Sequence, residues 1–510
     1  MKKIALIPAL CVFLIWSCQP ETDISPIDPS YSLTDQEENG MIKVGRKLEN
    51  PYSVENMSKA FQNLLNSEEN GKLLEENVDI IATHLYVKFK PESEEELDIL
   101  KSDSTLILYS YPLDYELELT GHYYHDPEVP DEQPTYQYCS VPIDKPLPST
   151  VDYEILEELY IPDDYSDVNN QGARKELLTE YLVEEALRIT GNLSQKPNKN
   201  SSLLGLRSSW RPAGRISLQD NDLNGIVGVS GIEVHARRWF TTHKGFTNSS
   251  GYFSCDGTFK RDANYSIPWR RYDYEIRSGS SDLAELYGPK DTGDWNITIA
   301  SESTHWMYAL VHQAANDYYY VNRLGLKSPP QNSFWKSSVK ISLRNESNSD
   351  ANGSHCKDCR FLGILSSIHI WKNTSSSSGI YATALHELAH ASHWELRKNN
   401  WLATEDRIIE SWARGAQWAL GRLRYPNYRG GATIRPKYTQ IVVDMIDGPT
   451  DFNEGSENIN EDNVTGYTIK NIEDVLSNTT SWADWHNNIK NSYENTTENN
   501  LQTLFNHWGN

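Results

Sequence analysis

The sequence predicts a multidomain α+β protein. Residues 81–91 and 104–119 alternate apolar and polar side chains as strands do, with a helical pattern over residues 91–102 between them. A strand-rich block extends from about residue 210 to residue 277, and long patterns of helical period begin after residue 300. About 460 residues follow residue 50, which is enough for two to four domains.

The first 18 residues (1–18) predict an export signal. Lys2 and Lys3 precede an apolar run over residues 4–16, which is too short for a comfortable transmembrane helix. The run ends in the tetrapeptide IWSC, which resembles the lipobox of bacterial lipoproteins, although Trp16 departs from the usual small or aliphatic residue. The resemblance implies that Cys18 carries covalently attached lipid, with palmitate among the acyl chains. This lipid would anchor the exported chain to the outer membrane. The alternative is an ordinary cleaved signal with an incidental cysteine.

The next segment predicts a tether. Residues 19–50 are polar, acidic and proline-bearing, a composition that cannot bury a core. The formal net charge of -24 argues against a nucleic-acid partner, because a phosphate-binding surface needs clustered Lys and Arg. The cysteines beyond the anchor are Cys139, Cys255, Cys356 and Cys359, too few for a disulfide scaffold. The last two form a single CxxC pair, which favours a local disulfide or free thiols over a zinc site.

Residues 51–150 predict a small α+β unit. It begins with a helix over residues 51–75 and continues with the strands and the helix described above. Residues 151–203 predict a helical segment, most regular over residues 174–190, followed by a linker.

Residues 204–280 predict a β-sandwich. The segments at residues 214–216, 229–234 and 247–253 resemble the carboxypeptidase regulatory-like, transthyretin-type β-sandwich. The last of these segments places a glycine before an aromatic residue, because a tight turn needs a residue that tolerates positive φ. Such modules are usually accessory, so we assign this one no chemistry. The basic aromatic run at residues 235–240 fits either a ligand surface or ordinary alternation along one strand.

Residues 285–510 carry the motif with the clearest chemistry. A helix over residues 301–326 is expected first, then strands over residues 338–345 and 366–373. A packed helix follows, and it contains the stretch ATALHELAHASHW at residues 382–394.

The stretch HELAH has the HExxH pattern of zinc peptidases. Positions four apart lie on one face of a helix, about 6 Å apart along the axis, so His386 and His390 can aim both imidazoles at one ion. Glu387 then lies beside the ion without ligating it and can take a proton from a zinc-activated water. The motif predicts one Zn²⁺ ion with Glu387 as general base. The alternative is a buried amphipathic helix with incidental histidines.

Three candidates exist for the third ligand. The metzincin pattern requires a glycine where His393 stands and a ligand where Leu396 stands, so it fails. His393 lies about 10 Å along the helix axis from His386, too far for one ion shared with the first pair. It is expected to pack or to support the site through a hydrogen bond. The last candidate, Glu410, belongs to a helical pattern over residues 407–423, one turn and one returning helix after the motif.

The HELAH and ESWA segments resemble those of the gluzincins, the thermolysin-like zinc metallopeptidases, whose third ligand is a glutamate on the next helix. The resemblance implies zinc ligation by His386, His390 and Glu410, and a zincin-type α+β metallopeptidase domain over residues 285–510. The family's aspartate four residues after the ligating glutamate is Arg414 here. The support of the zinc-bound histidine is therefore built differently or by another residue. The alternative for Glu410 is a surface carboxylate paired with Arg414 at helical spacing.

The same family places a substrate strand and an oxyanion stabiliser near the motif. The strand before the motif helix is commonly an edge that pairs with an extended peptide, and SIHIWK at residues 367–372 is expected in that role. Tyr438, Tyr467 and His486 are the candidate oxyanion stabilisers.

Two functions are consistent with these features. The first is a membrane-anchored zinc metalloendopeptidase that acts on polypeptide or glycoprotein substrates. The second is a non-catalytic envelope lipoprotein with a structural or degenerate zinc site, whose β-sandwich and abundant aromatics (15 Trp, 29 Tyr) bind glycan or protein. Glu387 favours the enzyme, because a purely structural site has no use for a base beside the metal. The chain is also similar to exported bacterial lipoproteins that join a regulatory-like β-domain to a HELAH domain.

Overall fold

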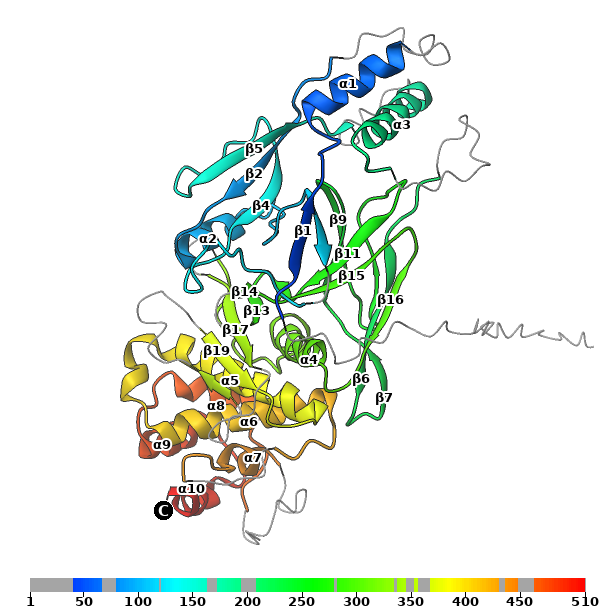
Figure 1. The fold of residues 1–510 in the computed structure, drawn as a ribbon. Helices are drawn as coiled ribbons and strands as arrows, with labels where there is room; N and C mark the ends of the chain where they lie inside the picture. The colour runs from blue at the N-terminus through cyan, green and yellow to red at the C-terminus, as the bar shows by residue number, and fades with distance from the viewer. Residues whose placement is uncertain are drawn as a thin grey trace, which may run out of the picture.

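The computed structural model shows a mixed α+β molecule with several sheets (Figure 1). It describes residues 40–66, 79–118, 121–162, 172–193, 208–278, 282–333, 337–344, 353–355, 367–430, 436–447 and 463–509. The predicted export signal, Cys18, residues 19–39 of the predicted tether, Cys356 and Cys359 lie outside the described residues. The predicted tether is wrong for residues 42–47, because Ile42 is fully buried and Lys43–Lys47 form a strand. Within those ranges, no helix combines the length and the apolar composition that crossing a membrane requires.

The N-terminal unit contains two small antiparallel sheets and three helices. One sheet pairs β1 with β3, and the other has the strand order β4-β2-β5. The helices α1 and α3 pack side by side (Figure 1). The bounds are β1 (Lys43–Lys47), α1 (Val54–Leu65), β2 (His84–Phe89), α2 (Glu94–Ser102), β3 (Tyr115–Glu118), β4 (Gln137–Pro142), β5 (Tyr153–Leu159) and α3 (Gly172–Ile189).

The predicted helical segment from residue 151 is wrong for residues 153–159. These residues form β5, which pairs with β2 along its whole length. The segment YEILEEL is rich in Leu and Glu, which favour helices, but strand formation depends more on pairing with a neighbour than on intrinsic propensity. The predicted helix further along is confirmed as α3.

Two four-stranded sheets follow and share one hydrophobic core. The first has the order β10-β6-β16 with β7 paired to β6, and the second has the order β15-β11-β8-β9. The turn predicted within residues 247–253 is present, and Gly251 there has a φ of +84°. The bounds are β6 (Ala213–Asp220), β7 (Gly225–Gly228), β8 (Glu233–Arg238), β9 (Thr241–Phe246), β10 (Tyr252–Ser254), β11 (Ala263–Pro268), β15 (Glu285–Asp291) and β16 (Trp295–Ile299). The shared core includes Ile216, Leu218, Val234, Ala236, Ile267 and Ile297.

A six-stranded sheet supports the motif helix. Its order is β12-β13-β17-β19-β18 with β14 paired to β13; β13, β17 and β19 are parallel, and β18 is antiparallel to β19. The bounds are β12 (Arg270–Arg271), β13 (Tyr274–Ser278), β14 (Asp282–Leu283), β17 (Val339–Arg344), β18 (Gly353–His355) and β19 (Ser367–Trp371). Because β15 and β16 return to the preceding two sheets, strands of different sheets interleave across residues 280–285, where the sequence predicts a domain boundary.

The two faces of this sheet have different partners. One face carries buried apolar side chains such as Ile341 and Ile368, which share a core with α4 (Thr304–Asn316) and α5 (Ser377–Arg397). The opposite face carries charged side chains of β13 and β17 that pair with α2 of the N-terminal unit. Arg277 and Lys340 each lie 2.7 Å from Glu94, and Lys101 lies 2.6 Å from Glu275. Ion pairs therefore join the N-terminal unit to this sheet.

The C-terminal helices complete the fold around α5. Helix α4 continues into a π-helical turn, η2 (Asp317–Val321), and α6 packs along α5 as the predicted returning helix (Figure 1). The remaining bounds are η3 (Lys398–Ala403), α6 (Asp406–Arg424), α7 (Ile441–Ile446), α8 (Ile469–Leu476), α9 (Trp482–Ser492), η4 (Glu498–Asn500) and α10 (Leu501–Gly509).

Candidate metal centre

The motif helix α5 is anchored at its N-terminus by the turn between β6 and β7. The Asp222 carboxylate accepts a 2.6 Å hydrogen bond from the backbone N–H of Ser378 and a 2.7 Å bond from the Ser376 hydroxyl. The backbone N–H of Asn221 donates to Ser377 Oγ at 2.8 Å. A carboxylate at a helix N-terminus is favourable because it meets unpaired N–H groups and the positive end of the helix dipole. The sandwich sheets thus fix where the motif helix begins.

Three side chains converge between α5 and α6. The Nε2 atoms of His386 and His390 are 3.1 Å apart, and Glu410 Oε2 lies 3.4 Å from the first and 3.2 Å from the second. The two imidazole rings are perpendicular, with centroids 4.6 Å apart. In the part of the chain that the structure describes, these three residues form the only group of His, Cys, Asp and Glu side chains arranged to hold a metal ion.

The spacing of these atoms fits zinc. Zinc binds imidazole nitrogen and carboxylate oxygen at about 2.0–2.2 Å, so two ligand atoms of a tetrahedral site lie about 3.3 Å apart. The three separations of 3.1, 3.2 and 3.4 Å match this requirement. Three protein ligands leave the fourth tetrahedral position open, as catalytic zinc sites do.

The electrostatics of the centre distinguish its two carboxyl groups. Burial alone would raise the pKa of Glu410, but His390, followed by hydrogen bonds with both imidazoles, lowers it well below its usual value. Burial raises the pKa of Glu387 to about 7; His386 opposes this increase, and Glu410 contributes to it. Glu410 is therefore held as a carboxylate that can ligate a cation. Glu387, only 4% exposed, can both accept and release a proton near neutral pH.

The edge strand beside the centre is β18. The expectation that the SIHIWK strand forms the edge is wrong, because β19 is paired to β18 from Ile368 to Ile370. A Cβ atom at Gly353 of β18 would lie 2.6 Å from Glu387 Oε1 and 3.0 Å from its Cγ. The backbone of β18 therefore approaches the Glu387 carboxyl closely, and a Cβ atom at Gly353 would require the carboxyl or the strand to shift.

His386 is supported by a residue that the sequence did not single out. Its Nδ1 atom lies 3.2 Å from Gln417 Oε1, and Gln417 Nε2 donates to the Tyr428 hydroxyl at 2.9 Å. Gln417 follows Glu410 by two helical turns on α6, so helical periodicity could have placed it on the same face. Arg414, which stands at the position of the family's aspartate, is buried.

The remaining candidate residues lie in different surroundings. The Tyr438 ring stacks on His386, with centroids 6.3 Å apart and planes 25° apart. Tyr467 is buried beside α7, and His486 packs against Phe505 at 5.2 Å, whereas Tyr438 packs against a proposed ligand. His393 lies outside the ligand group: its ring packs edge-on against Trp401 at 4.9 Å, and burial lowers its pKa to about 3.

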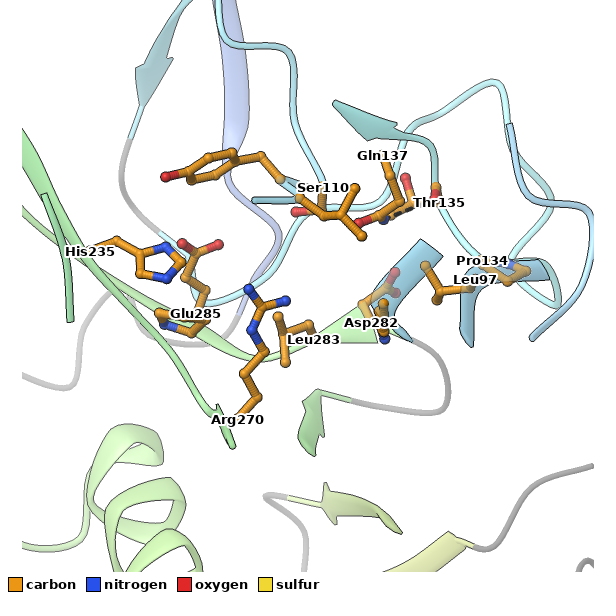
Figure 2. Close-up of a pocket in the computed structure, with 14 residues that line it drawn as sticks. Leu97, Ser110, Pro134, Thr135, Gln137, His235, Arg270, Asp282, Leu283 and Glu285 are labelled. Carbon is orange, nitrogen blue, oxygen red and sulfur yellow. Dashed lines mark hydrogen bonds between the residues drawn. The ribbon is translucent and has the colours of Figure 1, made fainter. Parts of the chain in front are cut away.

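A separate small cavity of about 30 Å³ lies between the N-terminal unit and the sandwich sheets (Figure 2). Its lining includes Tyr109, His235, Arg270 and Glu285 and none of the three converging residues. His235 pairs with Glu233 at 2.8 Å. The neighbouring basic residues Arg237 and Arg238 donate hydrogen bonds to Trp239 O and Asp262, so these side chains of the run at residues 235–240 make contacts within the protein.

No family model matches the chain, and no curated protein matches it. The resemblances to the regulatory-like β-sandwich and to the gluzincins therefore stay predictions, and the case for a function rests on the geometry of the centre.

Proposed function

We propose that this chain is a zinc metalloendopeptidase whose metal ligands are His386, His390 and Glu410. The observation that carries the proposal is the tetrahedral spacing of their three ligand atoms, with the buried Glu387 carboxyl on the same helix as the two histidines. The six-stranded sheet and the helices around α5 would then form a zincin-type domain of the gluzincin kind, and the two sandwich sheets, which include β15 and β16, a transthyretin-like accessory module.

The residues of the centre have complementary roles in peptide hydrolysis. A zinc ion bound there would activate a water molecule and polarise the scissile carbonyl. Glu387 takes the proton of the attacking water and passes it to the leaving amine. The Tyr438 ring, which stacks on His386, is the best placed of the three candidate oxyanion stabilisers.

Strand β18 supplies the surface for the substrate backbone. It is the last strand of its sheet among the described residues, and it passes directly over Glu387. An extended polypeptide can add to such an edge through backbone hydrogen bonds, which give affinity with little sequence preference. We therefore propose polypeptide or glycoprotein substrates, cleaved by an exported enzyme that Cys18 anchors to the outer membrane.

The test separates zinc binding from hydrolysis. Glu387→Gln keeps the shape of the side chain and all three ligands, so bound zinc should remain near one ion per chain while hydrolysis of an unfolded protein falls by about 10²- to 10⁴-fold. Glu494→Gln, the same change at an exposed position, is the control. Undiminished hydrolysis by Glu387→Gln would exclude the mechanism. Zinc bound to a wild-type chain that cleaves nothing would instead favour the non-catalytic envelope lipoprotein.

A further inference from the structure

The end of β6 in the sandwich contacts the motif helix α5 and the two helices packed against it, α4 and α6. We call residues 219–222 the β6 clamp. The backbone carbonyl of Gln219 accepts a 2.7 Å hydrogen bond from the Trp306 indole of α4. The Asp220 carboxylate accepts a 2.8 Å bond from the hydroxyl of Tyr425, the residue that follows α6.

The contacts of the β6 clamp with α5 hold the first turn of this helix. The Asp222 carboxylate accepts bonds from the Ser378 backbone N–H at 2.6 Å and from the Ser376 hydroxyl at 2.7 Å. The Asn221 side chain donates to Ser375 O at 3.0 Å. The first N–H groups of a helix have no partner within the helix, so acceptors placed there determine where it begins.

The clamp holds two helix ends that lie side by side. The ring of Tyr381 on α5 meets the ring of Tyr425 edge-on, with centroids 5.4 Å apart. Further along α5, His386 contacts Gln417, which precedes Tyr425 in the sequence. The two helices therefore run antiparallel, and the start of α5 lies beside the end of α6. These are the two helices that carry the proposed zinc ligands.

The position of α5 against α6 determines the spacing of those ligands. His386 lies about 12 Å along the helix axis from Ser378, a length over which a helix bends little. A shift of α5 would therefore move His386 and His390 relative to Glu410. The present separations of 3.4 and 3.2 Å allow little change, because zinc requires ligand bonds of about 2.0–2.2 Å.

We propose that the β6 clamp positions α5 against α6, and that Asp220 and Asp222 are thereby positioning residues for the zinc ligands. One end of the sandwich would then be a working part of the centre, beyond the role of an accessory module. The inference rests on the proposed function where it assigns zinc to the centre. Because α5 and α6 also share a hydrophobic core, loss of the clamp should shift the helices without separating them.

The experiment uses the full chain and removes one contact at a time. Asp222→Ala removes the acceptor at the start of α5, and Tyr425→Phe removes only the hydroxyl that bonds to Asp220. Hydrogen exchange of the metal-free protein measures how firmly the ends of α5 and α6 are held. Competition with a chelator gives the zinc dissociation constant, and hydrolysis of an unfolded protein gives kcat and KM.

We expect faster exchange at the ends of both helices in the two variants. Each substitution should raise the zinc dissociation constant by about 3- to 10-fold, less than the roughly 10- to 100-fold cost of losing a partner bonded directly to a ligand. The kcat should fall while KM changes little, because the reacting groups are displaced and the substrate surface is not.

Two substitutions elsewhere in the sandwich are matched controls. Asp256→Ala removes an exposed carboxylate that accepts a backbone N–H, and Tyr265→Phe removes a buried hydroxyl that donates to Gly293 O at 2.9 Å. Both should leave the exchange of α5 and α6, the zinc affinity and kcat unchanged, even if they lower the melting temperature.

The outcomes distinguish this inference from the proposed function. Zinc affinity and kcat within about twofold of wild type in folded Asp222→Ala and Tyr425→Phe proteins would overturn the inference, as would equal losses in the controls. Should Asp222→Ala not fold, Tyr425→Phe decides alone. Zinc binding that weakens only in the clamp variants, in a chain that cleaves nothing, would support the inference and contradict the proposed function. A wild-type chain that binds no zinc would contradict both.

Discussion

At the scale of single residues, Gly353 brings the backbone of β18 close to the carboxyl of Glu387. A methyl group there would meet Glu387 Oε1 at 2.6 Å, and the contact would displace either the strand or the carboxyl. We expect Gly353→Ala to lower kcat/KM for peptide hydrolysis by about 10- to 100-fold, because misplacing a catalytic group by about 1 Å costs that much. Bound zinc should stay near one ion per chain, since no ligand is touched.

A glycine with open space provides the control for that substitution. A Cβ atom at Gly293 would have only Asp291 Oδ2 nearby, at 3.9 Å, so Gly293→Ala should leave hydrolysis unchanged. Equal activity of Gly353→Ala and wild type would show that β18 does not approach the general base as described. Loss of both bound zinc and activity in Gly353→Ala would show that the substitution also disturbs the metal ligands and not only Glu387.

At the scale of elements, the contact between α2 and the six-stranded sheet should make stability depend on pH in acid. Burial alone would raise the pKa of Glu94, but Arg277, followed by Lys340 and Lys101, lowers it to about 2. A depressed folded-state pKa means that the stabilisation is present above the unfolded value of about 4.5 and is lost as the pH falls through about 2. The loss should be about 3 kcal/mol of unfolding free energy.

Denaturant unfolding at several pH values between about 5 and 2 measures this effect. Glu94→Gln should flatten the pH dependence in this window. It should also lower stability at neutral pH, because Arg277 is fully buried and would lose a charged partner. An identical pH profile for wild type and Glu94→Gln would show that the ion pairs do not contribute.

Much of the element order could be predicted from the sequence, and the exceptions have physical causes. The helices α4, α5 and α6 and the strands β17 and β19 have strong internal periodicity, which local sequence reveals. Strands β5 and β18 could not be predicted, because β5 has a helix-favouring composition and β18 is only three residues long. Their conformation is set by pairing with strands that are distant in sequence.

The candidate centre likewise has some features that the sequence could predict and others that it could not. The positions of His386 and His390 follow from the helix repeat, and Glu410 follows from a second helical pattern, so the sequence could nominate all three. The contacts of Gln417 and Gly353 could not be predicted, because they arise where α6 crosses α5 and where β18 pairs with β19. The hydrogen bonds of Asp222 at the N-terminus of α5 could not be predicted either, because they depend on how the sandwich sheets pack against this helix.

At the scale of the whole molecule, the proposed lipid anchor would place the protein at a membrane surface. Residues 19–39, which follow Cys18, are polar and acidic, and the described residues begin at Gly40. We expect Cys18→Ala to release the protein from the membrane fraction or to block its maturation, as cell fractionation and immunoblotting would show. A wild-type protein that is as soluble in the periplasm as Cys18→Ala would contradict the anchor. Ser17→Ala is the matched control.

Hydrolysis by the whole chain should require one zinc ion held by His386, His390 and Glu410. The most direct measurement removes metal with a chelator, returns zinc in steps, and records bound zinc and cleavage of an unfolded protein on the same samples. We expect no cleavage without metal and a plateau at one zinc per chain, with both lost in Glu410→Ala and zinc retained in His393→Ala. Cleavage that persists without zinc, or full zinc binding and activity in Glu410→Ala, would contradict this assignment.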